Sequence, residues 1–333
     1  MSKKTTITDI ANEAGISPTT VSQILNGKGE RFSATTRQKV LGLQKKMGYH
    51  NTGNDKPFES KVTVGMIVPS LDNPYYRELI HGVQDGLVSQ FAELSVEFSE
   101  NSEGIGYHIH ELSERPVDAI IVAGDNMDLA FVQTLLANTG LPSIIMDPQQ
   151  DNESSVAINE LEAGSKSAEY LLDNGHRKIA LLMKAGNSES KLHRITGFSN
   201  GLKEYHLDLD PTLFFEQPDD SKVSGFNSAK QVIDSGATAV FAFSDELAVG
   251  LNRGLLAHGK RVPEDISILG FDDIEITRYV QPELSTVHQP IQEMGEKLVK
   301  ILFAKKSDDE FKPDSDERLF SVVLKKRGSI KHI

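Results

Sequence analysis

The sequence predicts a protein of mixed α/β class, with a small head of three helices in helix-turn-helix geometry and a two-lobed core of parallel α/β sheets. Three observations predict this. Apolar residues recur at helical spacing within residues 6–47. After residue 62, strand-like and helix-like segments alternate. A core of about 270 residues exceeds one typical hydrophobic core, which favours two lobes.

The sequence of the head predicts that it forms three short helices. The first helix ends at Gly15, because glycine adopts the left-handed conformation that closes helices. Ser17 is a good N-cap for the second helix, and Pro18 fits its first position, where the missing N–H is not needed. Ser33 caps the third helix. A helix, a turn with glycine and a second helix with a polar outer face together predict a helix-turn-helix.

The sequence of the core predicts seven strands that are separated by amphipathic helices. The strands are expected at Val62–Val68, Leu94–Phe98, Ala119–Ala123, Ser143–Met146, Lys178–Met183, Ala239–Phe243 and Ser267–Phe271. The helices are expected near residues 75–90, 127–138, 160–174, 193–205, 225–235, 246–258 and 291–304. Strands joined by such crossovers form parallel sheets, which bind ligands beyond the carboxyl ends of their strands.

The charge of the chain is divided between head and core. The 333 residues carry a net charge of −13, yet residues 1–61 hold ten Lys and Arg against five Asp and Glu. A basic head on an acidic body confines attraction for DNA phosphates to the head. The absence of cysteine excludes disulfides and thiolate metal sites. No apolar run is long enough to span a membrane and no signal-peptide core is present, so we expect a cytoplasmic protein without membrane partners.

The segment from Thr8 to Gly27 closely resembles the DNA-binding head of the lactose/galactose repressor family. Further blocks that resemble the family follow in the family's order at Val64–Pro69, Asn73–Tyr76, Asn174–Ala180, Arg194–Phe198, Ile266–Asp273 and Ser285–Pro290. The resemblance implies a transcription repressor with a core like that of periplasmic sugar-binding proteins. In such a core two lobes are joined by crossover strands, an effector lies in the cleft and both lobes form a dimer.

The resemblance also implies a division of the chain and a set of partners. We expect a helix-turn-helix domain at residues 1–49, a hinge linker at 50–61 and an effector-binding and dimerisation core at 62–333. The N-lobe would comprise 62–160 and 291–323, and the C-lobe 161–290. The implied partners are near-palindromic operator DNA, a second copy of the chain, and a small effector such as a sugar or sugar phosphate.

Two other classes of protein are weaker interpretations. The chain has no G-x-x-x-x-G-K-S/T loop and no H-E-x-x-H helix, and its ten histidines are scattered. We therefore expect no enzyme, no cofactor and no metal. A transport-binding protein would share the core, but it would need a signal peptide and would not carry a basic helix-turn-helix.

The second helix of the head is implied to enter the major groove of DNA, with its N-terminal residues first. A merely solvated polar face is the alternative interpretation. The residues expected at DNA are Thr6, Ser17, Pro18, Thr19, Thr20, Ser22, Gln23, Asn26, Thr36, Arg37 and Phe58. Within this set, Thr6, Asn26, Thr36 and Arg37 are placed to meet phosphates.

Donors and acceptors fixed at strand ends suit the hydroxyl groups of carbohydrates, and the resemblance places Asp272 and Arg194 on the effector. The residues expected at the effector are Asn73, Tyr75, Tyr76, Asp147, Ser190, Arg194, Asp245, Asp272 and Gln289. A solvated turn carboxylate is the alternative for Asp272, and a surface guanidinium is the alternative for Arg194. Core packing is the alternative for Tyr75 and Tyr76, which could otherwise stack against a sugar face. The family often has an aromatic lid residue where this chain has Asp220, which favours a smaller or more polar effector.

The linker departs most from the family pattern. Family members usually have a short hinge helix there, whose leucine opens the central minor-groove step. Gly53 and Pro57 would cost such a helix about 1 and 3 kcal/mol. We therefore expect no ordinary hinge helix and a weaker central bend in the DNA. Phe58 is the apolar residue that could still act as a wedge.

The family usually has arginine at the position of Gln23, and this difference predicts a change in base preference. Glutamine pairs with adenine, whereas arginine pairs with guanine. Gln23→Arg should move the preference at one symmetric pair of operator positions toward G·C, by about 1–3 kcal/mol of discrimination. Selection of bound sequences from random DNA with both proteins measures this. Identical consensus sites would contradict the prediction.

Overall fold

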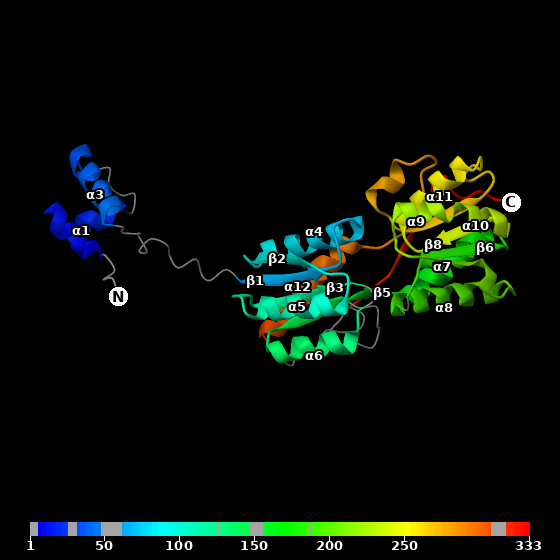
Figure 1. Cartoon of the computed structure of the whole chain (residues 1–333), viewed down its shortest axis with the longest axis horizontal. Coiled ribbons are helices and arrows are strands. Elements are labelled where there is room, and N and C mark those ends of the chain that lie inside the picture. Colours follow the sequence, from blue (N-terminus) through cyan, green and yellow to red (C-terminus); the bar gives the residue numbers. More distant parts are fainter. Residues whose placement is uncertain are drawn as a thin grey trace. The chain divides into compact units, whose positions relative to one another are not determined.

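The computed structural model describes residues 6–25, 32–47, 62–124, 127–146, 156–186, 188–307 and 318–333. The chain folds as two compact units, Met1–Lys61 and Val62–Ile333 (Figure 1). The predictions made for the hinge, for Asn26, for Phe58 and for Asp147 lie outside the described residues. No helix in the described ranges is long and apolar enough to cross a membrane.

The head consists of α1 (Ile7–Ala14), α2 (Pro18–Leu25) and α3 (Ala34–Lys46). Gly15 closes α1 with a φ of 69°, as predicted. The hydroxyl of Ser17 accepts the N–H of Thr20 at 3.1 Å, and that of Ser33 accepts the N–H of Thr36 at 3.1 Å, which confirms both predicted caps. The buried core of the head is formed by Ile10, Ala11, Val21, Ile24 and Val40. Because Val21 and Ile24 of α2 pack into this core, the opposite, polar face of α2 points outward.

The N-lobe is a parallel sheet with helices on both faces (Figure 1). Its strands, in the order β2-β1-β3-β4, are β1 (Thr63–Val68), β2 (Glu93–Phe98), β3 (Ala119–Ala123) and β4 (Ser143–Met146). Its helices are α4 (Pro74–Val88), α5 (Ser102–Ser113), α6 (Leu129–Thr139) and α12 (Ile291–Ser307). One face packs on α4 and α12, and the other on α5 and α6. Alternate residues of β1, β3 and β4 therefore contribute to two apolar cores, whereas β2, at the edge, contributes to one.

Helix α5 was not among the helices predicted by periodicity, although the resemblance implied a shortened N-lobe helix within residues 99–115. Gly104 and Gly106 lower the helix propensity of this segment. Tertiary packing outweighs that penalty, because Ile105, Ile109 and Leu112 recur on one side and are buried against β1 and β3.

The C-lobe has a six-stranded sheet in the order β12-β10-β9-β8-β6-β7. Its strands are β6 (Ile179–Lys184), β7 (Phe214–Gln217), β8 (Ala239–Ala242), β9 (Ser267–Asp272), β10 (Ser285–His288) and β12 (Val323–Lys325). Its helical elements are α7 (Glu160–Asp173), α8 (Glu189–Glu204), η1 (Pro211–Leu213), α9 (Lys222–Asn227), α10 (Ala229–Ser235), α11 (Asp245–Ala257) and η2 (Glu275–Arg278). Strands β7, β10 and β12 are additions to the prediction, and α9 and α10 divide the single helix expected near 225–235. These strands hold only three or four residues each, too few to show a clear periodicity.

Within the described residues, three segments connect the lobes. In the first, β5 (Ala157–Ile158) leads into α7 and pairs in parallel with β11 (Leu319–Phe320). The second runs from β10 into α12, which lies among the elements of the N-lobe (Figure 1). The third runs from β11 into β12, which pairs antiparallel with β10. The tail beyond residue 323, to which the sequence assigned no lobe, therefore joins the C-lobe sheet.

Helices α7 and α8 approach each other closely because glycines face the opposite backbone. A Cβ added at Gly164 would lie 2.1 Å from the carbonyl oxygen of Arg194. A Cβ added at Gly197 would lie 2.1 Å from the carbonyl oxygen of Leu161. Only glycine permits this approach, which sets the first turn of α7 against the second turn of α8.

Gly164→Ala should destabilise the core. An alanine favours a helix by about 1 kcal/mol over glycine, but here its methyl group must push the two helices apart. We expect a net loss of about 1–3 kcal/mol in the free energy of unfolding, measured by urea titration. Ser165→Ala, at the adjacent position of α7, is the control: it removes the hydrogen bond that Ser165 donates to Glu169 at 3.0 Å but adds no atom between the helices, and should change stability by less than about 1 kcal/mol. A Gly164→Ala protein as stable as this control would refute the packing argument.

Candidate functional site

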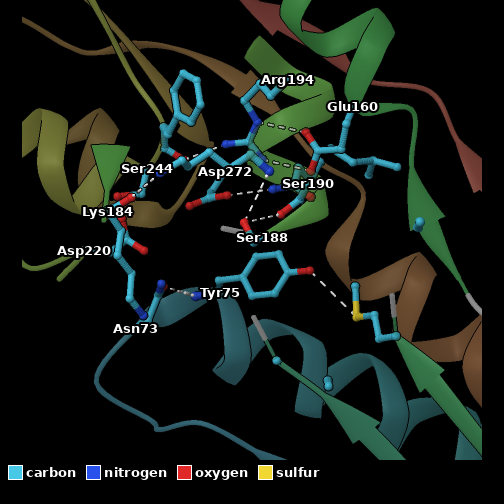
Figure 2. Close-up of a pocket in the computed structure, with 18 of the residues that line it drawn as sticks. Asn73, Tyr75, Glu160, Lys184, Ser188, Ser190, Arg194, Asp220, Ser244 and Asp272 are labelled. Carbon is cyan, nitrogen blue, oxygen red and sulfur yellow. Dashed lines mark hydrogen bonds and ion pairs between the residues drawn. The ribbon is translucent and has the colours of Figure 1, made fainter. Parts of the chain in front are cut away.

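A cavity of about 140 Å³ lies in the core, and both lobes contribute to its lining (Figure 2). Seven of the nine residues expected at the effector line this cavity: Asn73, Tyr75, Tyr76, Ser190, Arg194, Asp272 and Gln289. They come from the start of α4, the start of α8, the end of β9 and the segment after β10. The cavity thus lies at the carboxyl ends of strands, where parallel α/β sheets bind ligands.

The N-lobe contributes an aromatic wall. Asn73 caps α4 by accepting the N–H of Tyr75 at 2.9 Å, and Pro74 occupies the first helical turn. The rings of Tyr75 and Tyr76 meet edge to face with centroids 5.1 Å apart. Tyr75 is half-buried, and its hydroxyl donates to Sδ of Met146 at 3.8 Å. Such a wall offers an apolar face to a ligand and retains a polar group at its edge.

The guanidinium group of Arg194 is fixed by hydrogen bonds and by a stacked aromatic ring. Its Nε and Nη2 donate to the two carboxylate oxygens of Glu160 at 2.8 and 2.9 Å, and its Nη1 donates to the carbonyl oxygen of Phe243 at 2.8 Å. The ring of Phe271 covers one face of the guanidinium, with its centroid 3.4 Å from Cζ. Arg194 is buried, so the alternative of a surface guanidinium does not hold. Its orientation is set before any ligand arrives.

Asp272 ends β9 with a φ of 113°, and Asp273 follows with a φ of 59°. Two successive non-glycine residues with positive φ cost free energy, and such strain is typical of functional sites. The carboxylate of Asp272 accepts from Nε2 of Gln289 at 2.6 Å and is buried, so it is not a solvated turn residue. Burial raises the pKa of Asp272 well above its ordinary value, and the nearby Asp245 raises it further, whereas Arg194 acts in the opposite direction.

The structure corrects the expectation for Asp245, which does not line the cavity. Its side chain is fully buried at the start of α11. The carboxyl group accepts the hydroxyl of Thr286 at 2.7 Å and the N–H of Ile274 at 3.0 Å. Gly270 leaves the space for it, because a Cβ there would lie 2.1 Å from the carboxyl oxygen. Asp245 therefore links α11 to β10 and to the segment after β9, beneath the site.

Several lining residues were not among those expected at the effector, although the resemblance had placed Asp220 at the lid position. They include Glu160, Lys184, Ser188, Lys191, Asp220 and Ser244. Lys184 ends β6 and Ser244 follows β8, so their position after a predicted strand was an available signal. Glu160 offered no such signal, because its contact with Arg194 spans 34 residues and depends on the packing of α7 on α8. No group of acidic or histidine side chains in the described ranges could hold a metal ion.

The head presents the predicted DNA-binding residues at helix starts and on the outer face of α2. Ser17, Pro18 and Thr19 are exposed, whereas Thr20, Ser22, Gln23, Thr36 and Arg37 are partly exposed. Thr6 is exposed and takes part in a capping box with Asp9. Capping also engages the hydroxyls of Ser17 and Thr20, which are 2.9 Å apart. These side chains cap the N-termini of the helices, and helix N-termini are suitable sites for phosphates.

Comparisons with known proteins agree with this architecture. The family model described as "Bacterial regulatory proteins, lacI family" matches residues 6–51, and that of a "Periplasmic binding protein-like domain" matches residues 168–330. The HTH-type transcriptional repressor PurR of Pasteurella multocida (strain Pm70) is 33% identical over 314 residues, which cover 90% of this chain and 91% of the relative. PurR of Vibrio vulnificus (strain CMCP6) is 32% identical over 340 residues, which cover 98% and 99%.

The chain belongs to the lacI family of bacterial regulatory proteins. It is a transcriptional repressor of that family and not an enzyme, as predicted. A family member from Enterococcus faecium solved with bound ribose has a TM-score of 0.74 and 33% identity, and the match covers 81% of this chain and 99% of that one. The lac repressor dimer bound to operator and the anti-inducer ONPF has a TM-score of 0.76 and 25% identity, covering 99% and 100%. The predicted fold class is confirmed.

Asp245→Asn should alter how the stability of the core depends on pH. Burial raises the pKa of Asp245 to about 8, so the folded protein keeps a proton that the unfolded chain, with an ordinary pKa of 3.8, has lost. The stability that this proton provides is complete below about pH 4 and is lost as the pH rises to about 8. Asparagine can accept from Ile274 and donate to Thr286 without titrating.

Urea unfolding at intervals between pH 4 and 8.5 measures this effect. The free energy of unfolding of the wild type should fall relative to that of Asp245→Asn across the interval. Curves that stay parallel would show that Asp245 is ionised in the folded protein.

Proposed function

We propose that this protein represses a carbohydrate-utilisation operon and that a small sugar in the core cavity controls its affinity for the operator. The observation that carries this proposal is the combination of Arg194, Asp272 and Gln289 with the aromatic wall of Tyr75 and Tyr76 in one cavity. Sugars present hydroxyl groups that both donate and accept, together with apolar ring faces. Fixed polar groups opposite an aromatic wall match both features.

The lining of the cavity and one structural neighbour support a small sugar. The lining combines several polar side chains with two tyrosines, which suits a small hydroxylated ligand. The Enterococcus faecium regulator, 33% identical to this chain, holds ribose. The polar Asp220 in the lining also favours a compact, hydroxylated effector.

We propose that the head binds a near-palindromic operator in double-stranded DNA through the exposed face of α2 and the helix starts around it. Thr19, Thr20, Ser22 and Gln23 would meet the bases, while Thr6, Thr36 and Arg37 would meet phosphates. The lac repressor, 25% identical to this chain, is bound to its operator as a dimer. A homodimer of this chain would match a two-fold symmetric operator, and a protein that binds genomic DNA in bacteria acts in the cytoplasm.

A ligand that contacts both lobes can act as a switch. Tyr75 and Tyr76 belong to the N-lobe, whereas Arg194 and Asp272 belong to the C-lobe. A sugar held by both groups stabilises the arrangement of lobes in which both contacts form, and so shifts the population toward it. Operator affinity then follows that population.

Asp272→Ala tests the effector site. It removes a charge-assisted acceptor from a desolvated cavity, which should cost sugar binding about 2–5 kcal/mol. A thermal-shift screen of monosaccharides identifies the ligand, because one present at 100 times its Kd stabilises by about 2.7 kcal/mol. The shift should disappear in Asp272→Ala, whereas binding of operator DNA obtained by selection should persist. Asp234→Ala, which removes an exposed carboxylate of α10, is the control. Equal sugar titrations in all three proteins would refute the assignment.

A further inference from the structure

The cations that line the cavity are compensated by carboxylates of the protein itself. This bears on the chemical class of the effector, because a neutral sugar and a phosphorylated sugar differ by about two negative charges. The inference rests on the proposed function, since it concerns which sugars the cavity admits. Arg194, Lys191 and Lys184 are the basic side chains in the lining.

Arg194 would be the natural partner of a phosphate, but Glu160 occupies it. A guanidinium recognises phosphate and carboxylate best through two parallel N–H donors. The Nε and Nη2 pair of Arg194 is taken by Glu160, and the two side chains are only 10% and 7% exposed. A phosphate that displaced Glu160 would break a buried ion pair and add its own negative charge beside that carboxylate, which is costly.

The two lysines also lie near acids of the protein. Nζ of Lys191 contacts the carboxylate of Glu216 at 2.5 Å. Lys184 is partly exposed and shares the lining with Asp220 (Figure 2). The pKa of Asp219 is lowered by hydrogen bonds from Ser221 and Ser224, and the charge of Lys184 lowers it further. The lining therefore carries no excess of positive charge.

The surroundings of Asp272 are unfavourable to a further anion. Its pKa is raised first by burial and then by the neighbouring acidic groups Asp245 and Asp220, with Arg194 as the opposing cation. A ligand phosphate in this cavity would add to the same repulsion. A hydroxyl group, in contrast, can donate to the carboxylate of Asp272.

We propose that the effector is an uncharged sugar and that Glu160 is the residue that excludes phosphorylated sugars. Glu160 does so by neutralising Arg194 and by occupying its paired N–H donors. The carboxylate leaves the guanidinium in place as a fixed, charge-compensated part of the cavity wall. Glu160 is thus a determinant of specificity in the effector site.

The test compares each sugar with its own phosphate on the full-length protein by calorimetric titration. The probes are D-ribose with ribose 5-phosphate, D-glucose with glucose 6-phosphate and D-fructose with fructose 6-phosphate. The wild type should bind one neutral sugar at least about tenfold more tightly than the phosphate of that sugar. Glu160→Gln keeps the size of the side chain but removes its charge, and should reduce this ratio about tenfold or more.

The matched control is Glu162→Gln. It makes the same change two positions along α7, where the carboxylate contacts Lys166 at 2.5 Å and does not line the cavity. The ratio should stay at the wild-type value. Glu160→Asp, which keeps the charge, should also retain most of the discrimination.

Three results would overturn the inference. A wild type that prefers a phosphorylated sugar refutes the neutral effector but leaves a sugar-controlled repressor intact. A folded Glu160→Gln protein with the wild-type ratio refutes the role of Glu160. Binding of none of the six probes would refute the sugar effector and this inference together. The wild-type comparison does not depend on the folding of any variant.

Discussion

The buried ion pair between Glu160 and Arg194 is the interaction on which the proposed effector site depends. It joins the first turn of α7 to α8, and Arg194 extends the connection to Phe243 after β8 and to Phe271 in β9. Breaking such a pair typically costs about 3–5 kcal/mol, because the remaining charge stays buried. The pair exists only because glycines let α7 and α8 approach closely, so backbone packing decides where the guanidinium points.

A second constraint lies beneath the cavity, where three acidic side chains are buried close together. Asp272 faces the cavity, Asp245 is bound by Thr286 and Ile274, and Asp273 contacts Arg327 and His288. Arg327 comes from the C-terminal segment that follows β12. The tail of the chain thus supports the strained backbone after β9, which holds Asp272 in position. Strain and desolvation are thus concentrated at Asp272 and directly beneath the cavity that we propose as the effector site.

Much of the site was predictable because its residues follow predicted strands or helix caps. Asn73 precedes a proline at a helix start, and Asp272 ends an apolar strand, so local patterns locate both. The resemblance to the family assigned Arg194, but no local pattern shows its partner. Asp245 was expected at the effector, but its side chain does not reach the cavity. It lies just after β8, as Asp272 lies at the end of β9, yet its side chain is buried within the protein. Position along the chain does not reveal to which side of a strand end a carboxylate points.

The sequence by itself determined the three-helix head, the caps at Ser17 and Ser33, the alternation of strands and helices, and the basic charge of the head. These follow from interactions between residues a few positions apart, whose energies depend little on the rest of the chain. Only the tertiary structure decided that Glu160 meets Arg194, that α5 forms despite two glycines and that the tail completes the C-lobe sheet. These contacts join residues far apart in the sequence. Their free energy comes from burial and close packing, which exist only once the lobes are assembled.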